Sequence, residues 1–191
     1  MKVLAWPALL CFLCLCLYGQ GVVQAAEVVA EFKEDTYSVQ ASFEVATSPE
    51  KLVGVLTDYE NIAHLHPSFL ESEIISVNED SARIRTVVKD CAFLFCKKIL
   101  RVEQIRQDGF KSLVAEVIPM LSDLRSGQTV WEFTQAGAVT QVKYQSSLQP
   151  KFWIPPFVRS HTVTNKLKHR MGEIIQTLQT LDYDAYKKNA R

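Results

Sequence analysis

The residues that could do chemistry in this chain are few, and their spacing excludes most kinds of it. His64 and His66 stand two residues apart, as two zinc ligands can, but zinc needs three or four ligands and no third one lies nearby. The sequence also contains no glycine-rich loop of the kind that cradles phosphate groups. We therefore expect neither a metal ion nor a cofactor.

General acid–base catalysis is the enzymatic chemistry that the residue types leave open. A nucleophilic mechanism needs a Ser or Cys beside an activating base, and the two cysteines beyond the N-terminal segment are explained better as a disulfide. The candidate acid–base groups are Asp123, Arg125, Tyr144 and His161. Catalysis would need a titratable pair in one shared cavity, so we predict a binding protein and keep an enzyme as the alternative.

The N-terminal segment has the parts of a secretory signal peptide. A short basic start at Met1-Lys2 precedes an apolar run from Val3 to Tyr18, and small residues stand at Val23 and Ala25. An uncleaved anchor is the alternative, because the sixteen apolar residues fall just below the spanning length of about 17–25. We expect cleavage after Ala25, which makes residues 1–25 a signal peptide and places the protein in the periplasm or outside the cell.

Two cysteines, Cys91 and Cys96, remain in the mature chain, and they are an even number in an oxidising compartment. The four residues between them match a hairpin loop whose two ends face each other across paired strands. We predict a disulfide between Cys91 and Cys96.

The mature chain, residues 26–191, is long enough for one hydrophobic core and too short for two domains. The whole chain has 21 Lys and Arg against 21 Asp and Glu, and the signal removes only Lys2. A net charge near −1 gives no general attraction to nucleic acid. We expect one domain that stays a monomer and binds no nucleic acid.

Periodicity predicts the order of the elements. Apolar residues alternate with polar ones from Asp35 to Val45, which indicates a half-buried strand, and 28–32 is expected to pair with it. Ser48-Pro49-Glu50 predicts the start of a short helix, and a second short helix ends at Pro67. Further strands are expected at about 70–78, 81–90, 96–107, 111–118, 127–135 and 139–149. A long helix is expected from Pro155-Pro156 to about Leu181. Its predicted inward stripe reads Phe157, His161, Thr164, Leu167, Met171, Ile174, Ile175, Leu178 and Leu181.

This order, and the stretch FEVATSPEKLVGVLTDYENIAHLHP at residues 43–67, resemble the START-like (SRPBCC) helix-grip superfamily. That superfamily includes START domains, polyketide cyclases and dehydrases, and coenzyme-Q-binding proteins; this chain resembles an exported bacterial member over residues 35–182. The resemblance implies an α+β fold. A curved antiparallel β-sheet wraps around a long C-terminal helix, two short helices follow the first strand, and a cavity separates sheet and helix. It transfers no catalytic residues, because relatives bind, carry or cyclise their ligands.

The predicted ligand-binding residues combine an aromatic set with two polar interruptions. Aromatic residues that face a helix are often only core, but His161 and Thr164 interrupt the apolar stripe of the final helix, and a buried polar group without a partner costs about 1–3 kcal/mol. Either Tyr144, Ser146 or Asp123 satisfies them, or a ligand does, or His161 serves catalysis. The predicted set is Phe43, Trp131, Phe133, Tyr144, His161 and Thr164.

Three loops, 90–96, 118–127 and 149–156, fall at one end of an antiparallel sheet, and we call them the mouth. Loops are normally polar, but the mouth contains Phe93, Leu94, Phe95, Met120, Leu121, Leu124, Phe152 and Trp153. The flanking basic residues are Lys89, Lys97, Lys98, Arg125, Lys151 and Arg159. The loops either cap a closed core, dock a partner protein, or touch an anionic membrane.

We predict that the protein binds an apolar small molecule or lipid in an internal cavity and exchanges it at a membrane through transient contact of the mouth. A cyclase- or dehydratase-type enzyme acting on a polyketide-like substrate is the alternative, and a protein-interaction module is a further one. At the opposite end of the sheet we expect polar turns without apolar residues of comparable size.

Overall fold

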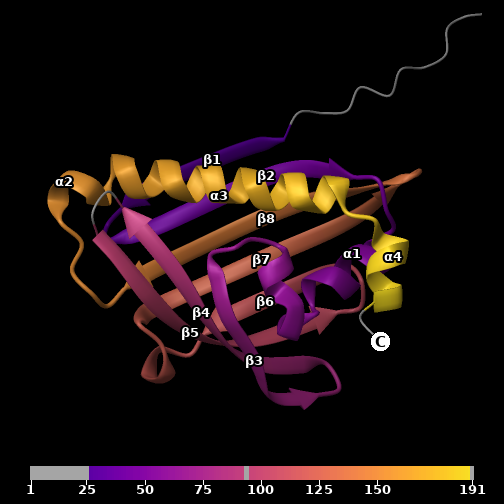
Figure 1. Ribbon diagram of the computed structural model, residues 1–191, viewed down its shortest axis with the longest axis horizontal. Helices are drawn as coiled ribbons and strands as arrows, with labels where there is room; N and C mark the ends of the chain where they lie inside the picture. The colour runs from indigo at the N-terminus through magenta and orange to yellow at the C-terminus, as the bar shows by residue number, and fades with distance from the viewer. Residues whose placement is uncertain (1–25, 93–94, 190–191) are drawn as a thin grey trace, which may run out of the picture.

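The computed structural model describes residues 26–92 and 95–189 of the chain (Figure 1). The predicted signal peptide lies outside the described residues, as do Phe93 and Leu94 of the mouth. The strands are β1 Glu27–Lys33, β2 Thr36–Val45, β3 Phe69–Asn78, β4 Ser81–Ala92, β5 Phe95–Asp108, β6 Ser112–Val117, β7 Leu124–Ala136 and β8 Val139–Pro150. The helices are α1 Pro49–Leu56, η1 Tyr59–His64, η2 Pro119–Leu121, α2 Pro156–Arg159, α3 His161–Thr180 and α4 Tyr183–Asn189.

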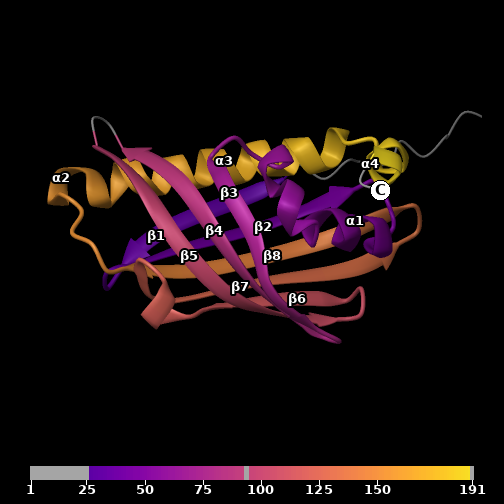
Figure 2. The same cartoon turned by 60° about the horizontal axis from the view of Figure 1, so that its bottom comes forward.

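All eight described strands form one antiparallel sheet in the order β1-β2-β8-β7-β6-β5-β4-β3. Strands β3 to β8 are a meander in which each strand pairs with its neighbour in sequence, and the β1–β2 hairpin joins it because β2 pairs with β8. The sheet curves around α3, which crosses its concave side (Figures 1 and 2). The predicted α+β helix-grip fold is confirmed.

The first helix follows from its sequence. The hydroxyl of Ser48 accepts a hydrogen bond from the backbone N–H of Lys51, and Pro49 occupies the first turn, where its missing N–H has no helical partner anyway. The apolar residues Leu52, Val53 and Leu56 are buried. Together with α4, α1 closes the end of the sheet that lies opposite the mouth (Figure 1).

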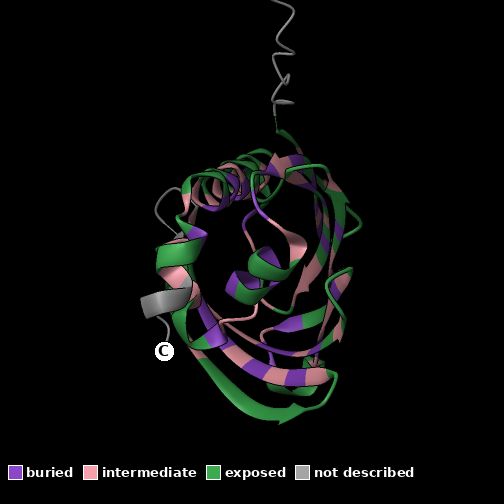
Figure 3. Cartoon of the chain, turned by 90° about the vertical axis from the view of Figure 1, so that its right-hand side faces the viewer, coloured by how far each residue is buried: buried purple, intermediate pink, exposed green. Residues whose placement is uncertain are grey.

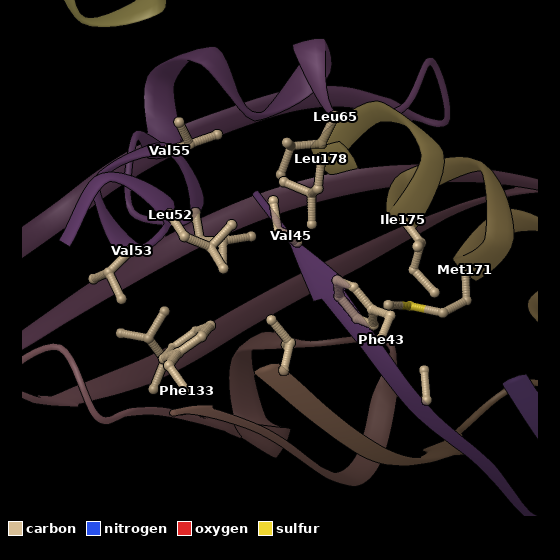
Figure 4. Close-up of a cluster of buried hydrophobic side chains, with 14 of the residues drawn as sticks. Phe43, Val45, Leu52, Val53, Val55, Leu65, Phe133, Met171, Ile175 and Leu178 are labelled. Carbon is tan, nitrogen blue, oxygen red and sulfur yellow. The ribbon is translucent and has the colours of Figure 1, made fainter. Parts of the chain in front are cut away.

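The hydrophobic core lies under the C-terminal half of α3. Met171, Ile175 and Leu178 are at most 4% exposed and pack in one cluster with Phe43 and Phe133 (Figure 4). The end-on view shows buried residues on both the helix and the curved sheet (Figure 3). The two aromatic side chains from the sheet fill the space under Ile175 and Leu178, and these four residues line neither of the cavities described below.

The final helix differs from its prediction in one respect. It is divided at Ser160 into α2 and α3. The division changes which residues face inward: Phe157 is 72% exposed, although we expected it on the inner stripe, and Val158 is buried instead. Beyond the division the predicted stripe holds from Leu167 to Leu178.

The end of the sheet opposite the mouth is less polar than we expected. Phe110 is 49% exposed and Val77 is 64% exposed there. Phe110 lies within the turn between β5 and β6, and β3 carries irregularities that break its alternation, one of them between Ile74 and Ser76. The prediction that this end has no large apolar side chains is therefore wrong.

Candidate functional site

A cavity of about 500 Å³ lies between the sheet and the N-terminal half of α3, and we call it the outer cavity. It is the hollow counterpart of the solid core, since the same helix covers both. Side chains from four strands and from α3 form its apolar wall. They include Val88, Ile99, Leu124, Leu148, Val163 and Leu167.

The mouth forms the rim of the outer cavity. Phe152, Trp153 and Ile154 line the rim. The backbone N–H of Lys151 donates to the carbonyl of Asp123 at 2.9 Å, and its ammonium donates to the carbonyl of Ser122 at 2.9 Å, so two of the mouth loops are joined. The third loop is linked to them by Lys97, whose ammonium lies 4.7 Å from the centre of the Phe152 ring.

Exposure at the mouth is uneven among the predicted residues. Trp153 is 76% exposed and Met120 is 89% exposed, whereas Leu124 is buried and belongs to the cavity wall. Phe152 is half-buried beneath Lys97. Phe95 begins β5, but its side chain is outside the description, as are Phe93 and Leu94. The disulfide between Cys91 and Cys96 is present, joining directly opposite residues of β4 and β5, and that prediction is confirmed.

A smaller inner cavity of about 130 Å³ lies deeper, and Arg101 lines both cavities. The Arg101 guanidinium donates from Nη2 to Glu103 Oε1 at 2.6 Å, and Glu103 is 4% exposed. The Arg101 Nε–H is buried without a hydrogen-bond partner. Both charges have lost their contacts with water, so each is stabilised mainly by the attraction of the other at this short distance.

A second ion pair connects the helix to the sheet. Nη2 of Arg170 in α3 lies 2.9 Å from Oδ1 of Asp90 in β4, and the two side chains are 18% and 21% exposed. Both residues line the outer cavity. Arg170 therefore fixes the N-terminal half of α3 over β4 where few apolar contacts do so.

Two of the predicted aromatic residues line the inner cavity. They are Trp131 and Tyr144, whose ring centres lie 4.5 Å apart in an edge-to-face arrangement. Burial raises the pKa of Tyr144, and the hydrogen bond with Ser146 and the charge of Arg101 only partly offset it, so the phenol remains a protonated donor. Phe43 and Phe133 lie instead in the solid core and line neither cavity.

His161 lies on the outer face of the helix, which corrects our expectation, and Thr164 is half-buried but lines neither cavity. His161 is exposed, and its Nδ1 lies 3.1 Å from Nδ2 of Asn165. The Thr164 hydroxyl donates to the carbonyl of Ser160 at 2.6 Å. Because a helix advances about 100° per residue, the face that carries Val163 and Leu167 turns His161 outward. The polar groups are satisfied locally and need no ligand.

The charged residues Asp90, Arg101, Glu103 and Arg170 were missed by sequence reasoning. One signal could have found two of them: Ile99, Arg101, Glu103 and Ile105 share one face of β5, so an opposite-charge pair stands between two isoleucines. The other proposed acid–base groups lie outside the cavities: Asp123 accepts a hydrogen bond from the Leu100 N–H at 2.9 Å, and Arg125 is exposed.

Two further findings concern the described part of the chain. Within it, no three or more His, Cys, Asp and Glu side chains come together as a metal site. No helix there combines the length and the apolar character needed to cross a membrane.

Comparison with known proteins relates this geometry to a family. The family model for polyketide cyclase / dehydrase and lipid transport matches residues 36–181. No curated protein sequence matches significantly.

Several solved structures share the fold. A STAR-related lipid transfer protein of Xanthomonas axonopodis is 13% identical, with a TM-score of 0.64 over 82% of this chain and 93% of that one. A protein of Thermus thermophilus is 18% identical, with a TM-score of 0.62 over 74% and 94%. The Zhui aromatase/cyclase of Streptomyces sp. R1128 is 14% identical, with a TM-score of 0.52 over 81% and 93%.

Proposed function

Because the chain belongs to the polyketide cyclase / dehydrase and lipid transport family, we propose that it binds an apolar molecule in the outer cavity and carries it. The observation that carries this proposal is a cavity of about 500 Å³ with mainly apolar walls between β-sheet and α3. Pockets of about 300–1,000 Å³ hold drug-sized molecules. An apolar ligand that fills this one leaves water and gains dispersion contacts with the wall.

The charged groups of the cavity favour carrying over chemistry. Glu103 and Asp90 are each engaged in an ion pair, with Arg101 and Arg170 respectively. A carboxylate that must accept a proton during catalysis would first have to leave its arginine, and breaking a buried pair costs about 3–5 kcal/mol. The paired state instead suits a site that holds a ligand without changing it.

An enzyme remains the second candidate, supported by one observation. The inner cavity brings Tyr144, Arg101 and Glu103 together, which is the kind of titratable group in a shared cavity that acid–base catalysis needs. A cyclase would convert a linear polyketide-like thioester into a cyclic product that is separable by chromatography. If wild-type protein makes the cyclic product and Tyr144→Phe does not, the protein is an enzyme that uses the Tyr144 phenol. If wild-type protein makes no cyclic product, the carrier function is favoured.

We propose further that the ligand enters and leaves at a membrane through the mouth. Trp153 and Met120 are highly exposed there, and exposed lysine and arginine side chains such as Lys97 and Lys151 flank them. Apolar side chains enter the interface of a bilayer, and each basic residue near an anionic surface adds about 1 kcal/mol. The same surface would also suit a partner protein, which the vesicle experiment below separates from a membrane.

The ligand itself is tested by native mass spectrometry of protein purified from the exported fraction, followed by lipid extraction. A bound apolar molecule of defined mass is expected. Protein that leaves purification without such a mass, and that takes up no apolar probe afterwards, contradicts the proposal.

Membrane contact is tested by sedimentation with anionic vesicles. The double variant Trp153→Ser, Met120→Ser should lose most binding, since each large side chain withdrawn from the interface contributes about 1.5–3 kcal/mol. The matched control is Phe110→Ser, Val77→Ser, which removes exposed apolar side chains at the opposite end. If the two variants sediment with vesicles to the same extent, the mouth is not the membrane contact, and its apolar residues serve to bind a partner protein or to cover the cavity.

A further inference from the structure

The two cavities contain more positive than negative charge. Among the described residues that line them, the cations are Lys97, Arg101 and Arg170, and the carboxylates are Asp90 and Glu103. Each carboxylate pairs with an arginine, and the Lys97 ammonium contacts a ring, not a carboxylate. The lining therefore carries one more positive than negative charge, and the extra charge belongs to Lys97, which is exposed at the rim.

The two arginines approach this space from opposite walls. Arg101 comes from β5 on the sheet, and Arg170 comes from α3. Each guanidinium has five N–H donors. Arg101 gives one hydrogen bond to its carboxylate, from Nη2, and Arg170 approaches its carboxylate through Nη2 in an ion pair. Among the described residues, Arg101 also has a buried Nε–H without a partner. Arg101 lines both cavities and Arg170 lines the outer one, so a group in the outer cavity can lie between them.

We propose that the ligand is an amphiphile with one anionic head group, a carboxylate or a phosphate, bound between Arg101 and Arg170. This inference rests on the proposed function and specifies its ligand class. The head accepts N–H donors that Glu103 and Asp90 leave free, including the buried Arg101 Nε–H, and charge-assisted bonds of this kind are stronger than neutral ones. The tail lies along the apolar wall of the outer cavity and points toward Phe152 and Trp153 at the mouth.

A neutral head group fits the same space less well. An alcohol or ester would accept one or two of the N–H bonds but would bring no negative charge to the guanidinium groups, and bonds between two ionised groups are the stronger ones. The head of the ligand, not its tail, is therefore the part that the cavity selects, since an apolar wall discriminates chain length only weakly.

The experiment compares four twelve-carbon probes with the full chain as exported. They are dodecanoic acid, dodecyl phosphate, dodecanol and methyl dodecanoate, titrated by calorimetry, with tryptophan fluorescence as a second readout. At least one of the two anions should bind about tenfold or more tightly than both neutral probes. This preference should persist at 0.5 M salt, about the level at which surface attraction is strongly screened but a buried pair is not.

Paired variants show which residues supply the preference. Arg101→Met with Glu103→Gln removes both members of the inner pair, so that no buried charge is left alone, and it should abolish the preference for the anions. Arg170→Met with Asp90→Asn tests the helix side and should reduce it. The matched control, Arg106→Met with Glu116→Gln, removes an exposed pair on the same sheet whose atoms lie 2.8 Å apart, and it should keep the full preference.

The outcomes separate the inference from the function on which it rests. If none of the four probes binds wild-type protein, the proposed function itself fails. If all four bind equally, or the neutral ones bind more tightly, the cavity is a ligand site but the anionic head is wrong. Should the Arg101 variant fail to fold, as circular dichroism would show, the wild-type comparison and the Arg170 variant still decide the matter.

Discussion

The two halves of α3 pack differently against the same sheet. Its C-terminal half places Ile175 and Leu178 in a solid core with Phe43 and Phe133, while its N-terminal half places Val163 and Leu167 over a cavity of about 500 Å³. One helix therefore supplies stability at one end and a binding wall at the other. The comparison indicates that the fold tolerates a cavity under one half of α3 because the hydrophobic core is concentrated under the other half.

The charges follow the same division. Within the described chain, the ion pairs that line the cavities, Arg101–Glu103 and Arg170–Asp90, lie around the hollow half. The cluster in the solid half packs mainly through apolar contact, and its few polar bonds include those of the Thr140 hydroxyl to the Thr47 carbonyl and of the Tyr183 hydroxyl to the Leu178 carbonyl. Polar recognition and hydrophobic stabilisation are thus carried by separate parts of one sheet.

The largest expected effect tests this division directly. Leu178→Ala should lower the free energy of unfolding by about 2–5 kcal/mol, because Leu178 is 0% exposed and its removal leaves a void in close packing. Leu167→Ala, the matched change in the hollow half, should cost clearly less, since it enlarges a space that already exists. Urea denaturation measures both, and equal losses would mean that the halves do not differ in packing.

The disulfide at the hollow end should have the next largest effect. Reducing the Cys91–Cys96 bond should cost about 2 kcal/mol, which is the chain-entropy estimate for so short a ring. The core should keep its near-ultraviolet circular dichroism, because the bond lies far from Leu178. A reduced protein with an unchanged urea midpoint would show that this hairpin adds nothing to stability.

The smallest expected effect concerns acid. Glu173 of α3 accepts from His66 Nε2 at 2.8 Å, and this hydrogen bond, with the nearby His169, lowers the pKa of Glu173. A carboxyl group with a lowered pKa stabilises the fold above its unfolded pKa of about 4.3, and that stability is lost as the pH falls through the folded value.

The variant Glu173→Gln should therefore be slightly less stable than wild-type protein at pH 6 and equal to it near pH 3. The difference is expected to be small, because the Glu173 side chain is 46% exposed. Thermal melts across this range measure it, and a constant difference at every pH would assign the loss to packing.

Much of the fold could be predicted because its signals are local. Alternation located the strands to within a few residues, and Ser48-Pro49 marked the start of α1. The face of α3 was mispredicted only in its first turn, since the division at Ser160 is a tertiary effect that shifts the helical phase. The site was less predictable: charged residues such as Arg101 read as solvent-facing, and only the curvature of the sheet turns that face of β5 inward.

The open sheet has a consequence for association between chains. Within the described residues, its two outer strands, β1 and β3, have no strand partner on one side, and unpaired strands can template pairing with other molecules. Charged residues Glu27, Glu31 and Lys33 punctuate β1, and register irregularities interrupt β3 at two points. The two edges are not equally protected, because β3 leaves Leu70, Ile74, Ile75 and Val77 at least 40% exposed, so β3 is the edge at which a second chain would more easily add a strand.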